Sequence, residues 1–130
     1  QRPDMPFAKI VRAALDGTTF TVFGDGTAER DFTYVDDVVS AFVSAAGAPA
    51  GGIFNVGGGE VASINAVIAL IGAAAGRKVD VRHAPPRPGD IKRSSADTTR
   101  LRAELGWKPS VSLREGIARQ VEAARTAVPR

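Results

Sequence analysis

Two arginines stand in settings that could hold a negatively charged ligand, and the first is Arg30. It opens a run from Arg30 to Val35 whose β-branched and aromatic content favours a strand. A strand would hold the guanidinium stiffly, and the planar fork of that group matches the oxygens of phosphate or carboxylate in pairs. By spacing alone, the simpler interpretation is a surface arginine paired with Glu29 or Asp31.

The second arginine lies in a proline-rich loop, Pro85-Pro86-Arg87-Pro88-Gly89-Asp90. Prolines stiffen a loop in advance, so less entropy is lost when a ligand orders it. Arg87 and Asp90 are the polar side chains that such a loop would present. A salt bridge between these two residues, closing a surface turn, is the structural alternative.

Two other features suggest chemistry less strongly. The run Gly57-Gly58-Gly59 superficially suggests a phosphate cradle, but the simpler interpretation is that the glycines only let the backbone turn sharply. His83 is the only histidine and there is no cysteine, so we expect no metal site and interpret His83 as the end of a strand.

Apolar spacing, caps and breakers predict the elements that position these residues. Pro6 opens a helix that Gly17 ends. Asp25-Gly26 predicts a tight hairpin between a strand at 20–23 and the strand of Arg30. Asp36 is the expected N-cap of the next helix, which runs to Ala46. Its apolar face comprises Val38, Val39, Phe42 and Val43.

The second half of the chain follows the same logic. Ile53 to Val56 is expected as a short buried strand, and Val79 to Arg82 alternates as another. Trp107 is expected to pin the C-terminal helix to the core. The expected helix signals are Ser63 as a cap with Gly76 as a stop, Asp97 as the cap of 98–105 with Gly106 as a stop, and Ser112 with Glu115 as a capping box.

Composition places the chain among single globular domains of 130 residues, with 44% hydrophobic and 24% charged residues. The net charge of +3 is spread along the chain and aromatics are few, which argues against nucleic-acid binding. No stretch approaches the length of a membrane span. The absence of cysteine fits a cytoplasmic protein.

Several ordered blocks together resemble the C-terminal half of the NAD-dependent nucleotide-sugar epimerases and dehydratases, which are extended short-chain dehydrogenases. Gln1 to Met5 resembles the segment that follows the dinucleotide-binding domain of that family. The blocks are Phe23-Gly24-Asp25-Gly26, Arg30-Asp31-Phe32-Thr33-Tyr34-Val35-Asp36-Asp37, Phe54-Asn55-Val56-Gly57-Gly58-Gly59, Arg87-Pro88-Gly89-Asp90, Ala96-Asp97 and Leu105-Gly106-Trp107-Lys108-Pro109.

The resemblance implies a UDP-sugar or dTDP-sugar as ligand and a role for five residues. Arg30 and Arg87 correspond to arginines on the diphosphate, and Asp90 to an aspartate near the ribose. Thr21 and Phe23 correspond to positions that hold the uracil or thymine base. Two residues after the strand arginine, family members often carry tyrosine, and this chain instead has Phe32.

The family's cofactor machinery has no counterpart in these residues. There is no glycine-rich dinucleotide loop, and the single tyrosine, Tyr34, is followed four residues later by Val38 where the catalytic pair needs lysine. We therefore expect a small mixed α/β (α+β) lobe of short strands and about five helices, formed by residues 1–130 without the N-terminal Rossmann domain. Such a lobe would bind no NAD by itself, and the start at Gln1 without methionine favours a fragment of a larger enzyme.

An isolated lobe of this kind would expose an apolar face toward its missing domain, which could favour self-association. The alternative from another class is a free-standing, non-catalytic module that binds a nucleotide or a protein.

Overall fold

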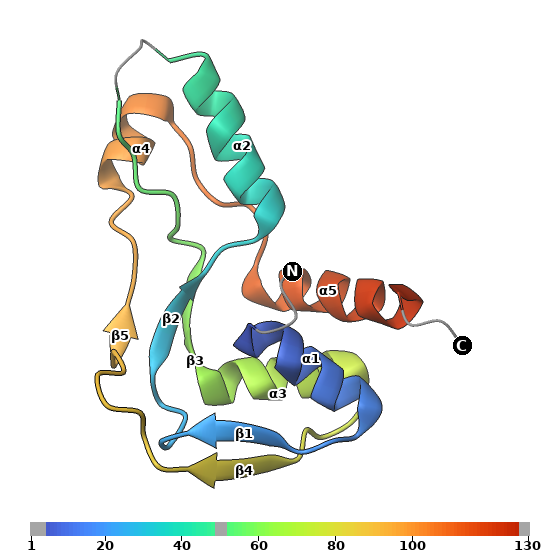
Figure 1. Ribbon diagram of the computed structural model, residues 1–130. Helices are drawn as coiled ribbons and strands as arrows, with labels where there is room; N and C mark the ends of the chain where they lie inside the picture. Colours follow the sequence, from blue (N-terminus) through green and yellow to red (C-terminus); the bar gives the residue numbers. More distant parts are fainter. Residues whose placement is uncertain (1–4, 49–51, 128–130) are drawn as a thin grey trace.

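The structure is a computed structural model that describes residues 5–48 and 52–127, so the family-like opening at 1–4 lies outside the described residues. It has the expected mixed α/β fold (Figure 1). The helices are α1 (Pro6–Asp16), α2 (Val35–Ala46), α3 (Ile64–Ala75), α4 (Thr99–Leu105) and α5 (Leu113–Ala127). The strands are β1 (Phe20–Phe23), β2 (Glu29–Phe32), β3 (Glu60–Ser63), β4 (Val81–Ala84) and β5 (Arg93–Ser94).

The strands form two small sheets, and the predicted hairpin is wrong. β1 pairs in parallel with β4, whereas β2 lies between β3 and β5, antiparallel to the first and parallel to the second. The Asp25-Gly26 turn does form, since the Asp25 carboxylate accepts hydrogen bonds from the amide and hydroxyl of Thr27 and Gly26 has a φ of 75°. It redirects the chain from one sheet to the other because β2 finds its partners far along the chain.

The main core lies between α1, α3 and α5, which pack together to the right of β2 in Figure 1. The predicted first helix is confirmed: proline lies in its first turn and Gly17 ends it in the left-handed conformation. Ser63 caps α3 by accepting from the Ala66 amide at 3.1 Å, and Gly76 ends it. The largest fully buried side chains of this core are Ile10, Val67, Ile71, Ile117 and Val121.

A second, smaller cluster holds α2 and α4 together. It consists of Ala41, Leu101 and Trp107, with Phe54 and Leu105 packed against it. The indole Nε1 of Trp107 donates to the Ser40 hydroxyl at 2.8 Å. The expectation that Trp107 pins the C-terminal helix to the main core is therefore wrong, because its neighbours come from α2 and α4.

Helix α2 begins earlier than predicted and buries little of its apolar face. Its N-cap is Tyr34, so Asp36 lies inside the first turn and is not the cap. Asp37 is 2% exposed, and its carboxylate accepts from the Ser110 amide and hydroxyl and from the Val111 amide. Phe42 and Val43, expected on an apolar face, are 70% and 69% exposed.

The predicted strand at 53–56 is also wrong. These residues belong to no β-bridge, and Ile53 is 86% exposed. The strand that follows α2 is β3, four residues further along, and it pairs with β2. A strand requires a partner backbone, and within the described part of the chain the segment 53–56 has none.

Smaller differences concern the ends of elements. The strand expected at 79–82 lies at β4, two residues later. The cap of α4 is Thr98, and Asp97 instead accepts from the Thr99 amide at 2.9 Å. The Ser112 half of the predicted capping box is present, since its hydroxyl accepts from the Glu115 amide. The Glu115 carboxylate accepts from Arg119.

The three consecutive glycines serve close packing. Gly58 has a φ of 70°, and its amide donates to the Asp31 carboxylate at 2.8 Å. A Cβ on Gly59 would collide with the carbonyl oxygen of Phe32, and a Cβ on Gly57 would lie 2.6 Å from that of Ala96. These contacts explain the glycines as structural residues that allow close backbone packing, and they need no phosphate as an explanation.

Replacing Gly59 by alanine is expected to destabilise the fold by about 1–3 kcal/mol, because the obstructing atom belongs to a β2 backbone that cannot move aside cheaply. Urea unfolding followed by circular dichroism measures the change. Gly47→Ala is the matched control, since φ there is −89° and the nearest atom lies at 3.8 Å. Equal midpoints for the two variants would contradict this explanation.

Candidate functional site

Arg30 lies on β2 and reaches into the loop between β4 and β5. Its Nη2 contacts Asp90 Oδ1 at 2.8 Å, and its Nη1 donates to the carbonyls of Ile91 at 2.6 Å and Glu29 at 2.8 Å. The Arg30 side chain is 30% exposed. A guanidinium has five N–H donors, so these three contacts hold it in place and leave donors free.

Neither expected partner within the strand pairs with Arg30. The Glu29 carboxylate contacts Arg93 at 2.8 Å. The Asp31 carboxylate accepts from the amides of Gly58 and Ala96 at 2.8 and 3.0 Å. The simple surface pairing of Arg30 with its neighbours is therefore wrong, because each neighbour is used elsewhere.

Arg87 lies against the aromatic ring of Phe23, with its Cζ 3.8 Å from the ring centroid. Phe23 ends β1 and is 42% exposed. The alternative salt bridge between Arg87 and Asp90 does not form, since Asp90 pairs with Arg30. Within the described part of the chain, Arg87 has no carboxylate partner, and its guanidinium lies over the face of the Phe23 ring.

One short loop connects these contacts. Arg87 and Asp90 stand three residues apart in it, and the Asp90 amide donates to the Arg87 carbonyl at 3.2 Å. Gly89 has a φ of 79°, which permits the tight turn. The loop therefore carries one arginine and holds the other through its aspartate.

Thr21, the fifth residue named from the sequence, lies in β1 with its hydroxyl 3.3 Å from Nη2 of Arg82. Its described hydrogen bond is with Arg82 and not with Arg30, Asp90 or Arg87, but it occupies the same strand as Phe23. His83 in β4 makes a 2.8 Å hydrogen bond between its Nδ1 and the Gly24 carbonyl. Among the described residues, no three His, Cys, Asp or Glu side chains gather in a group that could hold a metal ion.

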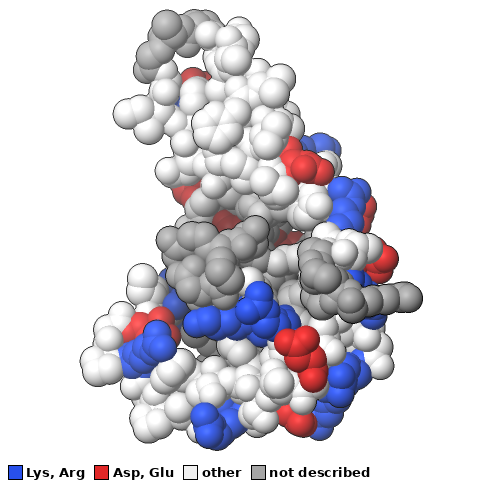
Figure 2. Space-filling model, turned by 45° about the vertical axis from the view of Figure 1, so that its right-hand side comes forward, with Lys and Arg blue, Asp and Glu red and all other residues white. Residues whose placement is uncertain are grey.

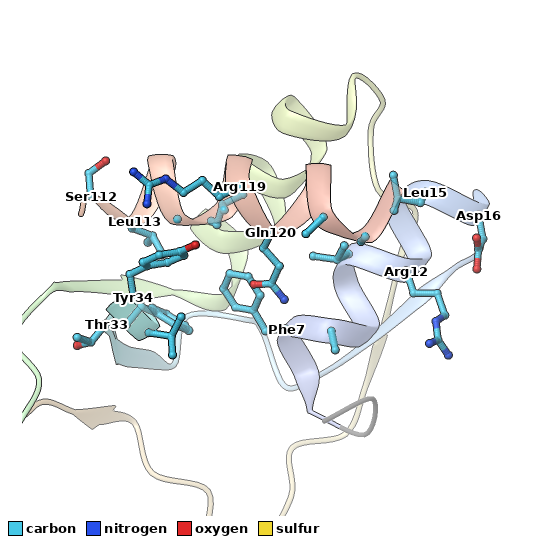
Figure 3. Close-up of a pocket in the computed structure, with 18 residues that line it drawn as sticks. Phe7, Arg12, Leu15, Asp16, Thr33, Tyr34, Ser112, Leu113, Arg119 and Gln120 are labelled. Carbon is cyan, nitrogen blue, oxygen red and sulfur yellow. The ribbon is translucent and has the colours of Figure 1, made fainter. Parts of the chain in front are cut away.

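A cavity of about 1140 Å³ lies elsewhere, between α1, α5 and residues 32–35. Figure 3 shows Tyr34, Arg119 and Ser112 at one end of it, and Arg12 and Asp16 at the other. The Arg119 guanidinium lies 5.3 Å from the Tyr34 ring centroid. Hydrogen bonds with Glu115 and with Tyr34 raise the pKa of Arg119 above its ordinary value.

No sequence pattern predicts this cavity, because the residues that line it are far apart in the chain and each fits an ordinary helix or strand position. None of the five residues named from the sequence lines it. No helix in the described ranges is both long enough and apolar enough to span a membrane.

Residues 3–120 match the family model described as GDP-mannose 4,6 dehydratase. A UDP-glucose 4-epimerase of Mycolicibacterium smegmatis is 50% identical over 112 residues, which cover 85% of this chain and 36% of that protein.

Solved structures agree with the sequence match. The UDP-glucose 4-epimerase of Thermotoga maritima with UDP-glucose superimposes with a TM-score of 0.92 at 35% identity, covering 99% of this chain and 43% of that one. MoeE5 in complex with UDP-glucuronic acid and NAD gives 0.91 at 35% identity, covering 98% and 44%. The chain thus spans less than half the length of these relatives. The resemblance seen in the sequence is confirmed, and the chain belongs to the GDP-mannose 4,6-dehydratase family, among the nucleotide-sugar epimerases and dehydratases of the extended short-chain dehydrogenases.

Proposed function

We propose that this chain is the nucleotide-sugar binding lobe of an NAD-dependent epimerase or dehydratase, and that its ligand is a UDP-sugar or a dTDP-sugar. The M. smegmatis relative is a UDP-glucose 4-epimerase, and the solved neighbours hold UDP-glucose or UDP-glucuronic acid. The lobe would supply the nucleotide site, while a dinucleotide-binding domain would supply NAD and the catalytic tyrosine and lysine.

The observation that carries this proposal is the pair of arginines joined by the loop at 85–91. Arg30 is held by Asp90 and the Ile91 carbonyl and keeps free donors, and among the described side chains Arg87 contacts the Phe23 ring without a carboxylate partner. Two guanidinium groups arranged in this way can share the charge of a diphosphate, to which charge-assisted hydrogen bonds each contribute about 1.5–3 kcal/mol.

The base and ribose would lie beside this pair. Among the described strands β1 is paired on one side only, so its other edge keeps backbone groups near Thr21 that could bind the polar edge of uracil or thymine. The Phe23 ring offers apolar contact to the same base. Asp90, which is 46% exposed, remains accessible to a ribose hydroxyl while it holds Arg30.

Isothermal titration of the 130-residue chain with UDP and with uridine tests the proposal. We expect saturable UDP binding at least about 10-fold tighter than that of uridine, because the diphosphate adds charged hydrogen bonds that the nucleoside lacks. Equal affinities for the two ligands would overturn the assignment of a diphosphate site.

The same titration with NAD is the control, together with an epimerisation assay on UDP-glucose. No saturable NAD binding is expected because these residues contain no glycine-rich dinucleotide loop, and no turnover is expected because Val38 follows Tyr34 where lysine would be needed. Measurable NAD affinity or epimerisation by this chain would contradict the proposed division of labour.

A further inference from the structure

The two-stranded sheet of β1 and β4 has an inner face toward the core and an outer face. Val22 is buried in the main core and Phe20 packs against that core, so these two side chains mark the inner face. Successive side chains of a strand point to opposite faces, which places Thr21 and Phe23 on the outer face. In Figure 1, β1 and β4 run side by side below α3.

Arg82 belongs to the same outer face. It is the register partner of Thr21 across the parallel pair, and paired residues point to the same side of a sheet. Its Nη2 donates to the Thr21 hydroxyl at 3.3 Å, so the guanidinium reaches from β4 across to β1. Within the described part of the chain Arg82 has no carboxylate partner, and this contact uses one of its five N–H donors.

Two arginines therefore flank one aromatic ring. Arg82 lies beside Thr21, whereas Arg87 lies over Phe23 with its Cζ 3.8 Å from the ring centroid. Thr21 and Phe23 are two positions apart, which is about 7 Å along a strand. Figure 2 shows lysine and arginine side chains in the lower half of the molecule, at the height of β1 and β4 in Figure 1, and their charge favours an anionic ligand there.

We propose that Arg82 selects the base of the nucleotide, admitting uracil and thymine and rejecting cytosine. This inference rests on the proposed function, which places the base beside Thr21 and Phe23. A guanidinium has donors and no acceptor, so it pairs with the O4 carbonyl of uracil or thymine. Cytosine carries an amino group at that position, and the two sets of donors would face each other without a partner.

A purely structural role fits the contacts of Arg82 less well. Its hydrogen bond to Thr21 joins a neutral hydroxyl at 3.3 Å, which is long for an N–H donor and contributes little to stability. The Arg82 side chain is also exposed, so it covers little apolar surface. A donor held over the sheet by one weak contact can turn to a carbonyl of the ligand without breaking a strong interaction.

Isothermal titration of the 130-residue chain with UDP, dTDP and CDP tests the proposal. UDP and dTDP are expected to bind at least about 10-fold more tightly than CDP, because cytosine leaves a charged donor unpaired. Arg82→Ala is expected to lower the UDP affinity about 10-fold and to change the CDP affinity by less than about twofold. An unchanged ratio of the two affinities in this variant would overturn the proposal.

Two further variants separate base selection from a general effect of charge. Arg82→Lys keeps a charged donor without an acceptor and is expected to retain the preference for UDP over CDP. Arg93→Ala removes one positive charge from an exposed position of β5 and is expected to leave the ratio unchanged. A ratio that falls as far in the Arg93 variant as in Arg82→Ala would assign the effect to net charge and overturn the proposal. Circular dichroism is expected to show the same fold in all three variants.

Nucleosides distinguish a failure of this inference from a failure of the proposed function. Uridine and cytidine lack the diphosphate, and uridine is expected to bind about 10-fold more tightly only while Arg82 is present. Equal affinities for UDP and uridine would overturn the diphosphate site and leave the base preference standing. Equal losses of UDP and CDP affinity in Arg82→Ala would overturn base selection alone, and no binding of UDP or uridine by the unaltered chain would overturn both.

Discussion

Arg30→Ala and Arg87→Ala are each expected to weaken UDP binding by about 10-fold to 100-fold, since each removes charged hydrogen bonds of about 1.5–3 kcal/mol. The Arg30 variant also leaves Asp90 without its partner, which places an unbalanced negative charge beside the diphosphate. Isothermal titration with UDP measures both effects.

Arg93→Ala is the matched control for this pair. Arg93 lies on β5 next to β2, but its side chain is 64% exposed and its guanidinium contacts Glu29. Its removal lowers the positive charge by the same amount as either test variant, but UDP affinity should change by less than about twofold. If both test variants bind UDP as tightly as the unaltered chain, Arg30 and Arg87 do not belong to the site.

Asp37→Asn is expected to destabilise the fold by about 2–4 kcal/mol at pH 7, because Asp37 is a buried carboxylate whose hydrogen bonds are all made. It accepts from two amides and one hydroxyl of Ser110 and Val111, and an asparagine would turn one acceptor into a donor facing a donor. This contact joins the start of α2 to the segment before α5. Urea unfolding at pH 7 measures the loss, and Asp36→Asn, whose side chain is 67% exposed, is the control.

The Asp37 carboxylate should also make the stability of the fold depend on pH. Burial alone would raise the pKa of Asp37, but the hydrogen bonds from Ser110 and Val111 and the charge of Arg119 outweigh it and lower the pKa below its ordinary value of 3.8. A carboxyl whose pKa is lower in the folded state stabilises the fold above its unfolded pKa of about 3.9 and loses that contribution as the pH falls through the folded value. The difference between the unaltered chain and the asparagine variant should therefore shrink from pH 7 to pH 3, and a constant difference would exclude the ionised carboxylate as its cause.

The sequence by itself was sufficient for the features whose causes are local. Pro6 and Gly17 mark the ends of α1, Ser63 and Gly76 those of α3, and the apolar spacing of α5 names Ile117 and Val121 as core. These predictions hold because caps, stops and helical periodicity act within a few residues. The family could also be identified, since its motifs are short and keep their order along the chain.

Only the tertiary structure decided which segments meet. The turn at Asp25-Gly26 is correct in its local geometry, but β1 and β2 join different sheets because β1 pairs with residues 81–84 and β2 with residues 60–63 and 93–94. Arg30 likewise pairs with Asp90, sixty residues away, and not with either neighbour, since Glu29 and Asp31 are committed elsewhere. Residues 53–56 show why composition alone does not predict a strand. Their composition favours strand pairing, but a strand forms only where a second backbone supplies the hydrogen bonds.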